Sequence, residues 1–277
     1  MSKEDRCSHP LADKVALVTG AAGAIGAGIC RGLLDEGCRV AATDVAAEAL
    51  ETLVNELGGG AQCDRVAGLQ MDVTDARSVA GAFASVQEKW GSIDLVVVNA
   101  GIAAVGALVD LDPAEFRRVQ KVNVEGTLLT LAEAGRRMRD QGTGGDIVLV
   151  STKNVFSPGA RFGAYSATKA AAHQLARIAS LEFAAFDVRV NMVAPDAVFS
   201  EGARRSGLWE EVGPARMRAR GMSRDELEEY YRKRNLLQAR VSAADVANAV
   251  VFFASRQTPT TGATLPVDGG LPDATPR

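Results

Sequence analysis

A tyrosine and a lysine four residues apart, Tyr165 and Lys169, are the pair in this sequence best suited to move a proton. They fall in an alanine-rich stretch, 163–186, whose pattern predicts a helix. Residues four apart on a helix share a face, so both side chains can reach one crevice. A free phenol has a pKa of about 10 and is a poor base at neutral pH. A neighbouring ammonium lowers that pKa, so the pair predicts a tyrosine that ionises more readily.

Other acid–base and metal-binding residues are scarce. The 277 residues include only two histidines, His9 and His173, so a general acid or base must be Tyr, Lys, Asp or Glu unless His173 lies in the site. The four cysteines have no CxxC spacing, which predicts reduced thiols and no metal site. They are Cys7, Cys30, Cys38 and Cys63.

A glycine-rich turn joins an apolar, strand-like run at 15–19 to a helical pattern at 25–36. Small residues allow the backbone to approach a pyrophosphate, and the N-terminus of the following helix favours its negative charge. The strand–turn–helix context makes this a dinucleotide-binding signal. The residues predicted to bind there are Gly20, Gly23, Ala24, Ile25 and Gly26.

Asp44 ends the second strand-like run, 39–43, about 20 residues beyond the turn. A carboxylate there accepts hydrogen bonds from the adenosine ribose hydroxyls and repels a 2′-phosphate. No Arg or Lys lies in the turn or just after Asp44, so NAD is favoured over NADP. The alternative, that Asp44 caps a helix starting near Ala46, is compatible with ribose binding.

The spacing of apolar residues predicts the fold. Continuous apolar runs indicate a sheet buried on both faces, and their alternation with helical segments indicates right-handed βαβ crossovers. We therefore predict a single-domain Rossmann fold of the α/β class, a doubly wound parallel sheet flanked by helices. The strands are expected at 15–19, 39–43, 66–71, 95–99, 147–151 and 188–193, and the helices at 25–36, 46–57, 76–90, 113–139, 163–186 and 243–254.

The domain is expected to span residues 14–270, with a flexible tail at 1–13 and another at 271–277. One segment, 199–238, interrupts the pattern and is rich in Arg, Glu and Gly. Its acidic run before Arg232 and Lys233 predicts an exposed helix with paired charges. A mobile lid over the substrate and a solvated decoration are both compatible with this composition.

The bulk composition excludes several classes of protein. Hydrophobic residues make up 47% and the net charge is −3, which gives no electrostatic footprint for nucleic acid or an anionic membrane. No apolar run approaches the ~20 residues of a membrane helix. The polar N-terminus is unlike a signal peptide, so a cytoplasmic protein is expected.

The glycine-rich turn, Asn99-Ala100-Gly101 and the Tyr165/Lys169 pair together resemble the short-chain dehydrogenase/reductase family over about residues 14–270. The resemblance implies an NAD-dependent oxidoreductase acting on CH–OH groups. It also implies that Lys169 binds the nicotinamide ribose and that Asn123 supports a water-linked proton relay. Further cofactor contacts implied by position are Asp72, Val73, Asn99, Ala100, Gly101, Tyr165, Lys169, Pro195, Ala197 and Val198.

The family's serine, which orients the substrate oxygen, stands thirteen residues before the tyrosine. Here that position is Thr152, which keeps the hydroxyl, and Ser151 is the rival. Adjacent side chains on a strand point to opposite faces, so only one of them can serve. We predict Thr152 as the catalytic residue.

Two departures from the family pattern concern the ligands. Ala24 replaces a usual glycine, which predicts a slightly different turn that still binds the cofactor. Asp196 also replaces a glycine, so its carboxylate is expected to face the nicotinamide or the substrate. Lys153 and Asn154 are candidate substrate residues; loop structure is the alternative for all three polar side chains.

The segments around these residues are similar to the dehydrogenase domain of bifunctional rhamnulose-phosphate aldolase/lactaldehyde dehydrogenase proteins, which implies a small, hydroxyl-rich, sugar-derived substrate. A dehydrogenase of sugars, polyols or hydroxyaldehydes is therefore predicted. A ketoreductase of acyl, steroid or aromatic carbonyls and a non-catalytic dinucleotide-binding regulator are the alternatives. By resemblance, the helices at 113–139 and 163–186 form homodimers or homotetramers.

Overall fold

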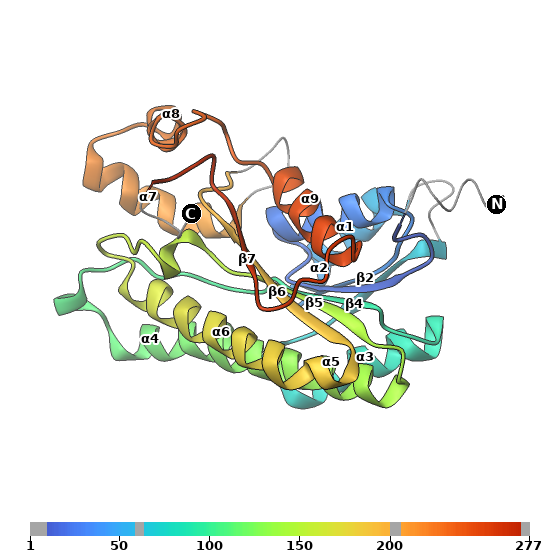
Figure 1. The fold of residues 1–277 in the computed structure, drawn as a ribbon. Coiled ribbons are helices and arrows are strands. Elements are labelled where there is room, and N and C mark those ends of the chain that lie inside the picture. Colours follow the sequence, from blue (N-terminus) through green and yellow to red (C-terminus); the bar gives the residue numbers. More distant parts are fainter. Residues whose placement is uncertain (1–9, 59–63, 200–205, 273–277) are drawn as a thin grey trace.

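The computed structural model describes residues 10–58, 64–199 and 206–272, which form a seven-stranded parallel sheet with helices on both faces (Figure 1). The strand order is β3-β2-β1-β4-β5-β6-β7. From β1 the chain first adds strands on one side, β2 and β3, and then crosses over to add β4 to β7 on the other. This confirms the predicted Rossmann fold. The strands are β1 (Val15–Thr19), β2 (Arg39–Asp44), β3 (Val66–Gln70), β4 (Leu95–Val98), β5 (Gly145–Val150), β6 (Val188–Pro195) and β7 (Thr264–Val267).

Helices cover the two faces of the sheet in two groups (Figure 1). One face carries α1 (Ala24–Asp35), α2 (Ala47–Leu57) and α9 (Ala243–Ala254). The other carries α3 (Ala76–Trp90), α4 (Pro113–Gln120), α5 (Gly126–Gln141) and α6 (Gly163–Glu182).

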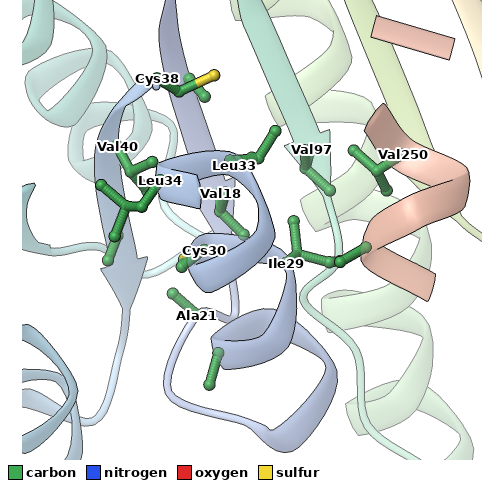
Figure 2. Close-up of a cluster of buried hydrophobic side chains, with 14 of the residues drawn as sticks. Val18, Ala21, Ile29, Cys30, Leu33, Leu34, Cys38, Val40, Val97 and Val250 are labelled. Carbon is green, nitrogen blue, oxygen red and sulfur yellow. The ribbon is translucent and has the colours of Figure 1, made fainter. Parts of the chain in front are cut away.

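The strands are buried on both sides because alternate side chains enter two separate apolar layers. Leu17 packs among the residues under α3, α5 and α6, whereas Val18 faces α1 and α9. Figure 2 shows this second layer, in which Val18 and Ile29 lie close to Val97 and Val250. Burying an aliphatic side chain of this size contributes about 1.5–3 kcal/mol. The two layers hold the strand ends, and the residues that follow them, in fixed positions.

The predicted helix at 113–139 is nearly continuous but not regular. A π-helical segment, Lys121–Glu125, lies between α4 and α5. Asp112 caps the N-terminus of α4, and Pro113 occupies its first turn, where a missing N–H costs nothing. Single π turns inside α-helices occur frequently at functional sites. Asn123 stands in the middle of this one.

The segment after β6 contains two helices, α7 (Gly207–Arg220) and α8 (Arg224–Lys233), which lie beyond the carboxyl ends of the strands (Figure 1). The predicted exposed helix with paired charges is confirmed in α8, where Glu229 pairs with Arg232 and Lys233. Ser223 and Glu226 cap its start reciprocally. We call residues 206–238 the lid; residues 200–205 of the predicted insertion lie outside the described ones.

Candidate active site

A cavity of about 490 Å³ lies where the strands end and extends to the lid. In open parallel sheets, ligands bind at the carboxyl ends of the strands where the strand order reverses, here beside β1 and β4. Every predicted site residue except Asn123 lines it. They are Gly20, Gly23, Ala24, Ile25, Gly26, Asp44, Asp72, Val73, Asn99, Ala100, Gly101, Thr152, Lys153, Asn154, Tyr165, Lys169, Pro195, Asp196, Ala197 and Val198.

The glycines of the turn serve different purposes. Gly20 has a φ of +62°, and a Cβ there would lie 2.8 Å from the Ala100 Cα. A Cβ on Gly26 would overlap the Gly20 carbonyl oxygen. Gly23, with a φ of −72°, has ordinary space, because its Cβ would meet only the Gly20 oxygen at 3.6 Å. The fold thus requires Gly20 and Gly26, whereas Gly23 leaves the start of α1 bare toward the cavity.

That helix start fits a pyrophosphate. Gly23 is the N-cap of α1 and contributes no capping side chain, and the first turn carries no acidic residue. The N–H groups at the start of a helix lack partners within it and, with the helix dipole, attract anions. Ala24 occupies the first helical position, so its methyl group is compatible with the turn, as predicted.

The side chains of Thr19 and Asn99 lock the turn to the end of β4. Asn99 Nδ2 donates to the carbonyl oxygens of Thr19 and Gly20, both at 2.9 Å. The Thr19 hydroxyl accepts from the N–H groups of Asn99 and Ala100, at 2.9 and 3.0 Å. Sequence reasoning did not single out Thr19; its position at the end of a buried strand, before the glycines, was the available signal.

Asp44 lies at the end of β2 and lines the cavity. One carboxylate oxygen accepts from the Ala46 N–H at 3.0 Å, and the other accepts from the Ala22 N–H at 3.0 Å. The capping alternative therefore has a structural basis, although Asp44 also braces the glycine-rich turn. Each carboxylate oxygen has a second lone pair, so the group can still accept bonds from ribose hydroxyls.

Asp72 and Val73 follow β3 and form the cavity wall on the side of the predicted adenine site. Asp72 Oδ1 accepts from the N–H and the hydroxyl of Thr74, both at 2.8 Å. The carboxylate thereby fixes the loop after β3. Its backbone and the apolar Val73 side chain are left to shape the wall, while the adenine contact itself stays a prediction.

At the ends of β5 and along α6, Thr152, Tyr165 and Lys169 come together, each less than a tenth exposed. Lys169 Nζ donates to the Val150 carbonyl oxygen at 3.0 Å, and the Thr152 hydroxyl forms a hydrogen bond with Tyr165. The predicted pair on one helix face therefore does reach one crevice. This arrangement can place a substrate oxygen beside a phenol and a hydroxyl while an ammonium lies close by.

Burial governs the pKa of both members of this pair in the chain without cofactor; the effect of the Lys169 charge together with an oxidised nicotinamide stays a prediction. Burial raises the pKa of Tyr165 to about 12, although the Thr152 hydrogen bond acts in the opposite direction. Burial also lowers the pKa of Lys169 to about 8. Loss of hydration penalises both charged forms. The free site therefore holds a neutral tyrosine.

Ser151 and Thr152 face different partners, because adjacent side chains of an extended chain point to opposite sides. The Ser151 hydroxyl lies 2.9 Å from His173 Nδ1, and His173 Nε2 lies 3.4 Å from the Thr264 hydroxyl. Burial, and to a lesser degree the charge of Arg177, lowers the pKa of His173. Among the described residues, His173 does not line the cavity but contacts Ser151, which does.

Asn123 lies just behind the wall and is 1% exposed. Its Oδ1 accepts from the Ile102 N–H at 2.9 Å, while its Nδ2 donates to the Ile102 oxygen at 2.9 Å and to the Thr168 hydroxyl at 3.0 Å. It joins the loop after β4 to α6. A Cβ on Gly101 would lie 3.2 Å from both Asn123 Oδ1 and Lys169 Nζ, so this glycine makes room for them. The proton-relay role stays a prediction.

Asp196 lines the cavity, but its carboxylate is already engaged. Arg234, at the end of α8, donates from Nε to Oδ2 at 3.2 Å and from Nη2 to both oxygens, at 2.6 Å for Oδ2. The Asp196 side chain is only 6% exposed. The pair therefore ties the lid to the end of β6. Lys153 also lines the cavity and donates to the Ser157 oxygen at 2.9 Å, and Asn154 beside it is buried.

The lid adds aromatic walls that the sequence did not reveal. Trp209 stacks on Phe199 at 4.4 Å between ring centroids and meets Tyr231 edge-on at 5.0 Å. Phe162 lies 6.1 Å from Tyr165 and joins the same apolar cluster. Helical charge patterns gave no hint of these contacts, because the cluster forms only when three separate segments meet. The lining residues missed from the sequence are Val45, Ile102, Val122, Val150, Gly159, Phe162, Ser206, Trp209, Glu211, Arg216, Tyr231 and Arg234.

Within the described ranges, none of the helices is long and apolar enough to cross a membrane. A family model described as short chain dehydrogenase matches residues 14–211. The chain is 38% identical over 262 residues to "Uncharacterized oxidoreductase YuxG" of Bacillus subtilis (strain 168), which covers 94% of this chain and 38% of that protein. The chain thus spans well under half of that relative.

Other relatives match along almost their whole length. D-threitol dehydrogenase of Mycolicibacterium smegmatis (strain ATCC 700084 / mc(2)155) is 34% identical over 259 residues, or 93% of this chain and 92% of that one. A crystal structure of a short-chain type dehydrogenase/reductase from Mycobacterium marinum superposes with a TM-score of 0.80 at 27% identity, covering 95% and 96% of the two chains. The finer resemblance to rhamnulose-phosphate aldolase/lactaldehyde dehydrogenase proteins stays a prediction. Fold, motifs and relatives agree that this chain belongs to the short-chain dehydrogenase family of oxidoreductases.

Proposed function

We propose that this enzyme transfers a hydride between NAD and a secondary alcohol, or the matching carbonyl, of a small polyol or sugar-derived substrate. The observation that carries the proposal is one cavity with two chemically distinct ends. Gly23 and Asp44 lie at one end, and Tyr165, Thr152 and Lys169 lie nearer the lid. A small substrate fits between them, and the similarity to a D-threitol dehydrogenase supports a polyhydroxylated one.

The residues that would hold the dinucleotide are the bare start of α1 for the pyrophosphate and Asp44 for the adenosine ribose. The wall at Asp72 and Val73 suits the adenine. When bound, the nicotinamide supplies the hydride chemistry, and the protein supplies orientation and charge.

Tyr165 would move the proton of the reacting hydroxyl, with Thr152 orienting the substrate oxygen. A neutral phenol is already suited to donate a proton to a forming alkoxide in the reducing direction. In the oxidising direction the phenol must first ionise, which adjacent positive charge favours. Lys169 would contribute that charge and bind the nicotinamide ribose.

The charged lining argues against a ketoreductase of apolar carbonyls, since Lys153, Asp196, Arg216 and Arg234 all border the substrate end. We also propose that the enzyme is a homodimer or homotetramer. Leu128 on α5 and Leu181 on α6 are 48% and 79% exposed, which suits a covered face. Light scattering of the purified protein tests this assembly.

The central test is a screen of purified enzyme with NAD or NADP against polyols, sugar acids, hydroxyaldehydes and apolar ketones, followed by cofactor absorbance. We expect NADH formation with the hydroxylated compounds. Turnover confined to apolar ketones with NADPH would refute both the cofactor and the substrate class.

A further inference from the structure

The lid end of the cavity carries more positive than negative charge. Lys153 enters from the loop after β5, while Arg216 and Arg234 come from α7 and α8. Two carboxylates, Asp196 and Glu211, also line this end. The positive charges at this end would be balanced only if these carboxylates formed ion pairs with all of the cations.

Neither acid neutralises Lys153 or Arg216, because each has another partner. Arg234 holds Asp196 through both oxygens. Glu211 accepts from Arg118 of α4 at 2.8 Å, and the two side chains are 41% and 44% exposed. Among the residues that the structure describes, Lys153 and Arg216 form no ion pair.

Arg216 is held in place without having its charge neutralised. Its guanidinium lies 4.6 Å from the centre of the Phe162 ring, and its Nη2 donates to the Tyr231 hydroxyl at 3.1 Å. Its Nε is buried and finds no hydrogen-bond acceptor in the described part of the chain. A guanidinium that is oriented by an aromatic face and a phenol, yet keeps a free donor, is prepared for an added acceptor.

The lowered pKa of Lys153 indicates the same excess of positive charge. Burial is the main cause that lowers its pKa, and the positive charges of Arg234 and Arg216 lower it further, against the attraction of Asp196. These cations repel one another inside a shared cavity. An anion between Lys153 and Arg216 would reduce that repulsion and strengthen every hydrogen bond made to it.

We propose that this end of the cavity binds an anionic group of the substrate, a carboxylate or a phosphate ester, between Arg216 and Lys153, while the reacting hydroxyl lies at Tyr165. The inference rests on the proposed dehydrogenase function and narrows its substrates to sugar acids or sugar phosphates. The substrate must be short, because a single ring, Phe162, separates Arg216 from Tyr165. Arginine binds carboxylate and phosphate alike, so both chemistries enter the test.

The kinetic test compares a short polyol with the acid and the phosphate ester of the same carbon chain. In the wild type, the anionic members are expected to have a kcat/KM roughly 10- to 100-fold above the neutral one. Arg216→Met should remove most of this ratio, and Arg216→Lys should restore part of it. Arg220→Met is the matched control: it lies one turn along α7, 4.2 Å over the Tyr230 ring, and does not line the cavity. The anion with the larger kcat/KM, the carboxylate or the phosphate ester, identifies the group that the site binds.

A binding test separates this inference from the dehydrogenase function. Inorganic phosphate and acetate, added with NAD, should raise the thermal midpoint of the wild type and of Arg220→Met, but not that of Arg216→Met or Lys153→Met. If no compound is turned over yet this pattern appears, the anion site stands and the proposed reaction fails. If polyols are oxidised as well as their anionic counterparts, or if all four proteins respond equally to the anions, the anion site is refuted.

Discussion

The two ends of the cavity are built by different means. At the nucleotide end the backbone forms the wall of the cavity, because Gly20 and Gly23 carry no side chains where they follow the buried strand β1. At the lid end side chains form the wall, through the Asp196–Arg234 pair and the rings around Trp209. A backbone cradle suits a ligand shared by many enzymes. A wall of side chains can change with each substrate, which is why function lies in the site and not in the fold.

The two ends also differ in how they are held. The nucleotide end follows strands that are covered on both faces. Among the described residues, the contacts of the lid include the buried Asp196–Arg234 pair, an apolar cluster, the exposed Arg118–Glu211 pair and backbone hydrogen bonds to Gly269 and Gly270. Local stability follows the number of buried contacts. Substitutions at the nucleotide end should therefore alter cofactor affinity, and those at the lid should alter substrate affinity and local protection from protease.

The largest effect is expected at Tyr165, where the two ends meet. Tyr165→Phe removes only the hydroxyl, so NAD should still bind while kcat falls about 10³-fold, within the range for loss of a general acid–base group. Steady-state turnover and NAD titration by protein fluorescence measure the two quantities separately.

Tyr230→Phe is the matched control, since this lid tyrosine packs under Arg220 and not against the cavity. It should retain full turnover. Near-normal kcat in Tyr165→Phe would remove this residue from the chemistry and leave proton transfer to another group.

Breaking the lid contact should produce the next largest effect. Arg234→Ala leaves the buried Asp196 carboxylate without its ion partner, and removal of one member of such a pair costs about 3–5 kcal/mol. We expect a higher substrate KM, by about 100-fold, and faster proteolysis within α8, with NAD affinity nearly unchanged.

The neighbouring Lys233→Ala provides the control, because its pair with Glu229 is exposed and such pairs contribute about 0–1 kcal/mol. Adding Asp196→Asn to Arg234→Ala should recover part of the loss, as no unpaired charge then remains. Equal protease sensitivity of Lys233→Ala and Arg234→Ala would show that the ion pair does not hold the lid.

The same contrast explains what the sequence could predict. The nucleotide end was predictable because local rules decide it: a buried apolar strand, small residues in a turn and a carboxylate one strand later. Thr152 could be preferred over Ser151 because it stands thirteen residues before Tyr165, as the family's serine does. Neighbouring strand residues face opposite ways, so only one of the two can serve. These inferences need only residues close together in the chain.

The lid end depends on contacts between distant segments. Asp196 and Arg234 are 38 residues apart, and nothing in either local pattern predicts their pairing. Arg216 lies in α7, whose sequence pattern does not distinguish it from an ordinary solvent-exposed helix. The raised pKa of Tyr165 was out of reach for a related reason, because the burial that causes it is a property of the folded molecule.

A smaller effect is expected at Asp44. Asp44→Ala removes a charged acceptor, so NAD affinity should fall by about 2 kcal/mol, roughly 30-fold, and discrimination against NADP should decline. Asp44→Asn separates the roles, because it keeps an oxygen for the Ala22 or Ala46 N–H but loses the charge. Unaltered preference for NAD in both variants would assign Asp44 to bracing alone.

The smallest effect is one on stability, and it tests whether the buried ammonium of Lys169, where the two ends meet, destabilises the folded chain. Burial lowers the pKa of Lys169 from 10.5 to about 8 in the folded chain. Between these values the unfolded chain binds more protons, so the free energy of unfolding should rise with pH across this window. Lys169→Met lacks that rise, and it also loses the bond to the Val150 oxygen, worth about 1 kcal/mol.

We therefore expect Lys169→Met to be more stable than the wild type near neutral pH by on the order of 1–2 kcal/mol, although inactive. Its advantage should shrink as the pH rises from about 8 to 10.5, as followed by urea unfolding. Lys89→Met, at an exposed position on α3, should show no such trend. An advantage that grows with pH would have the wrong sign for a buried ammonium, and it would mean that burial of Lys169 does not destabilise the folded chain.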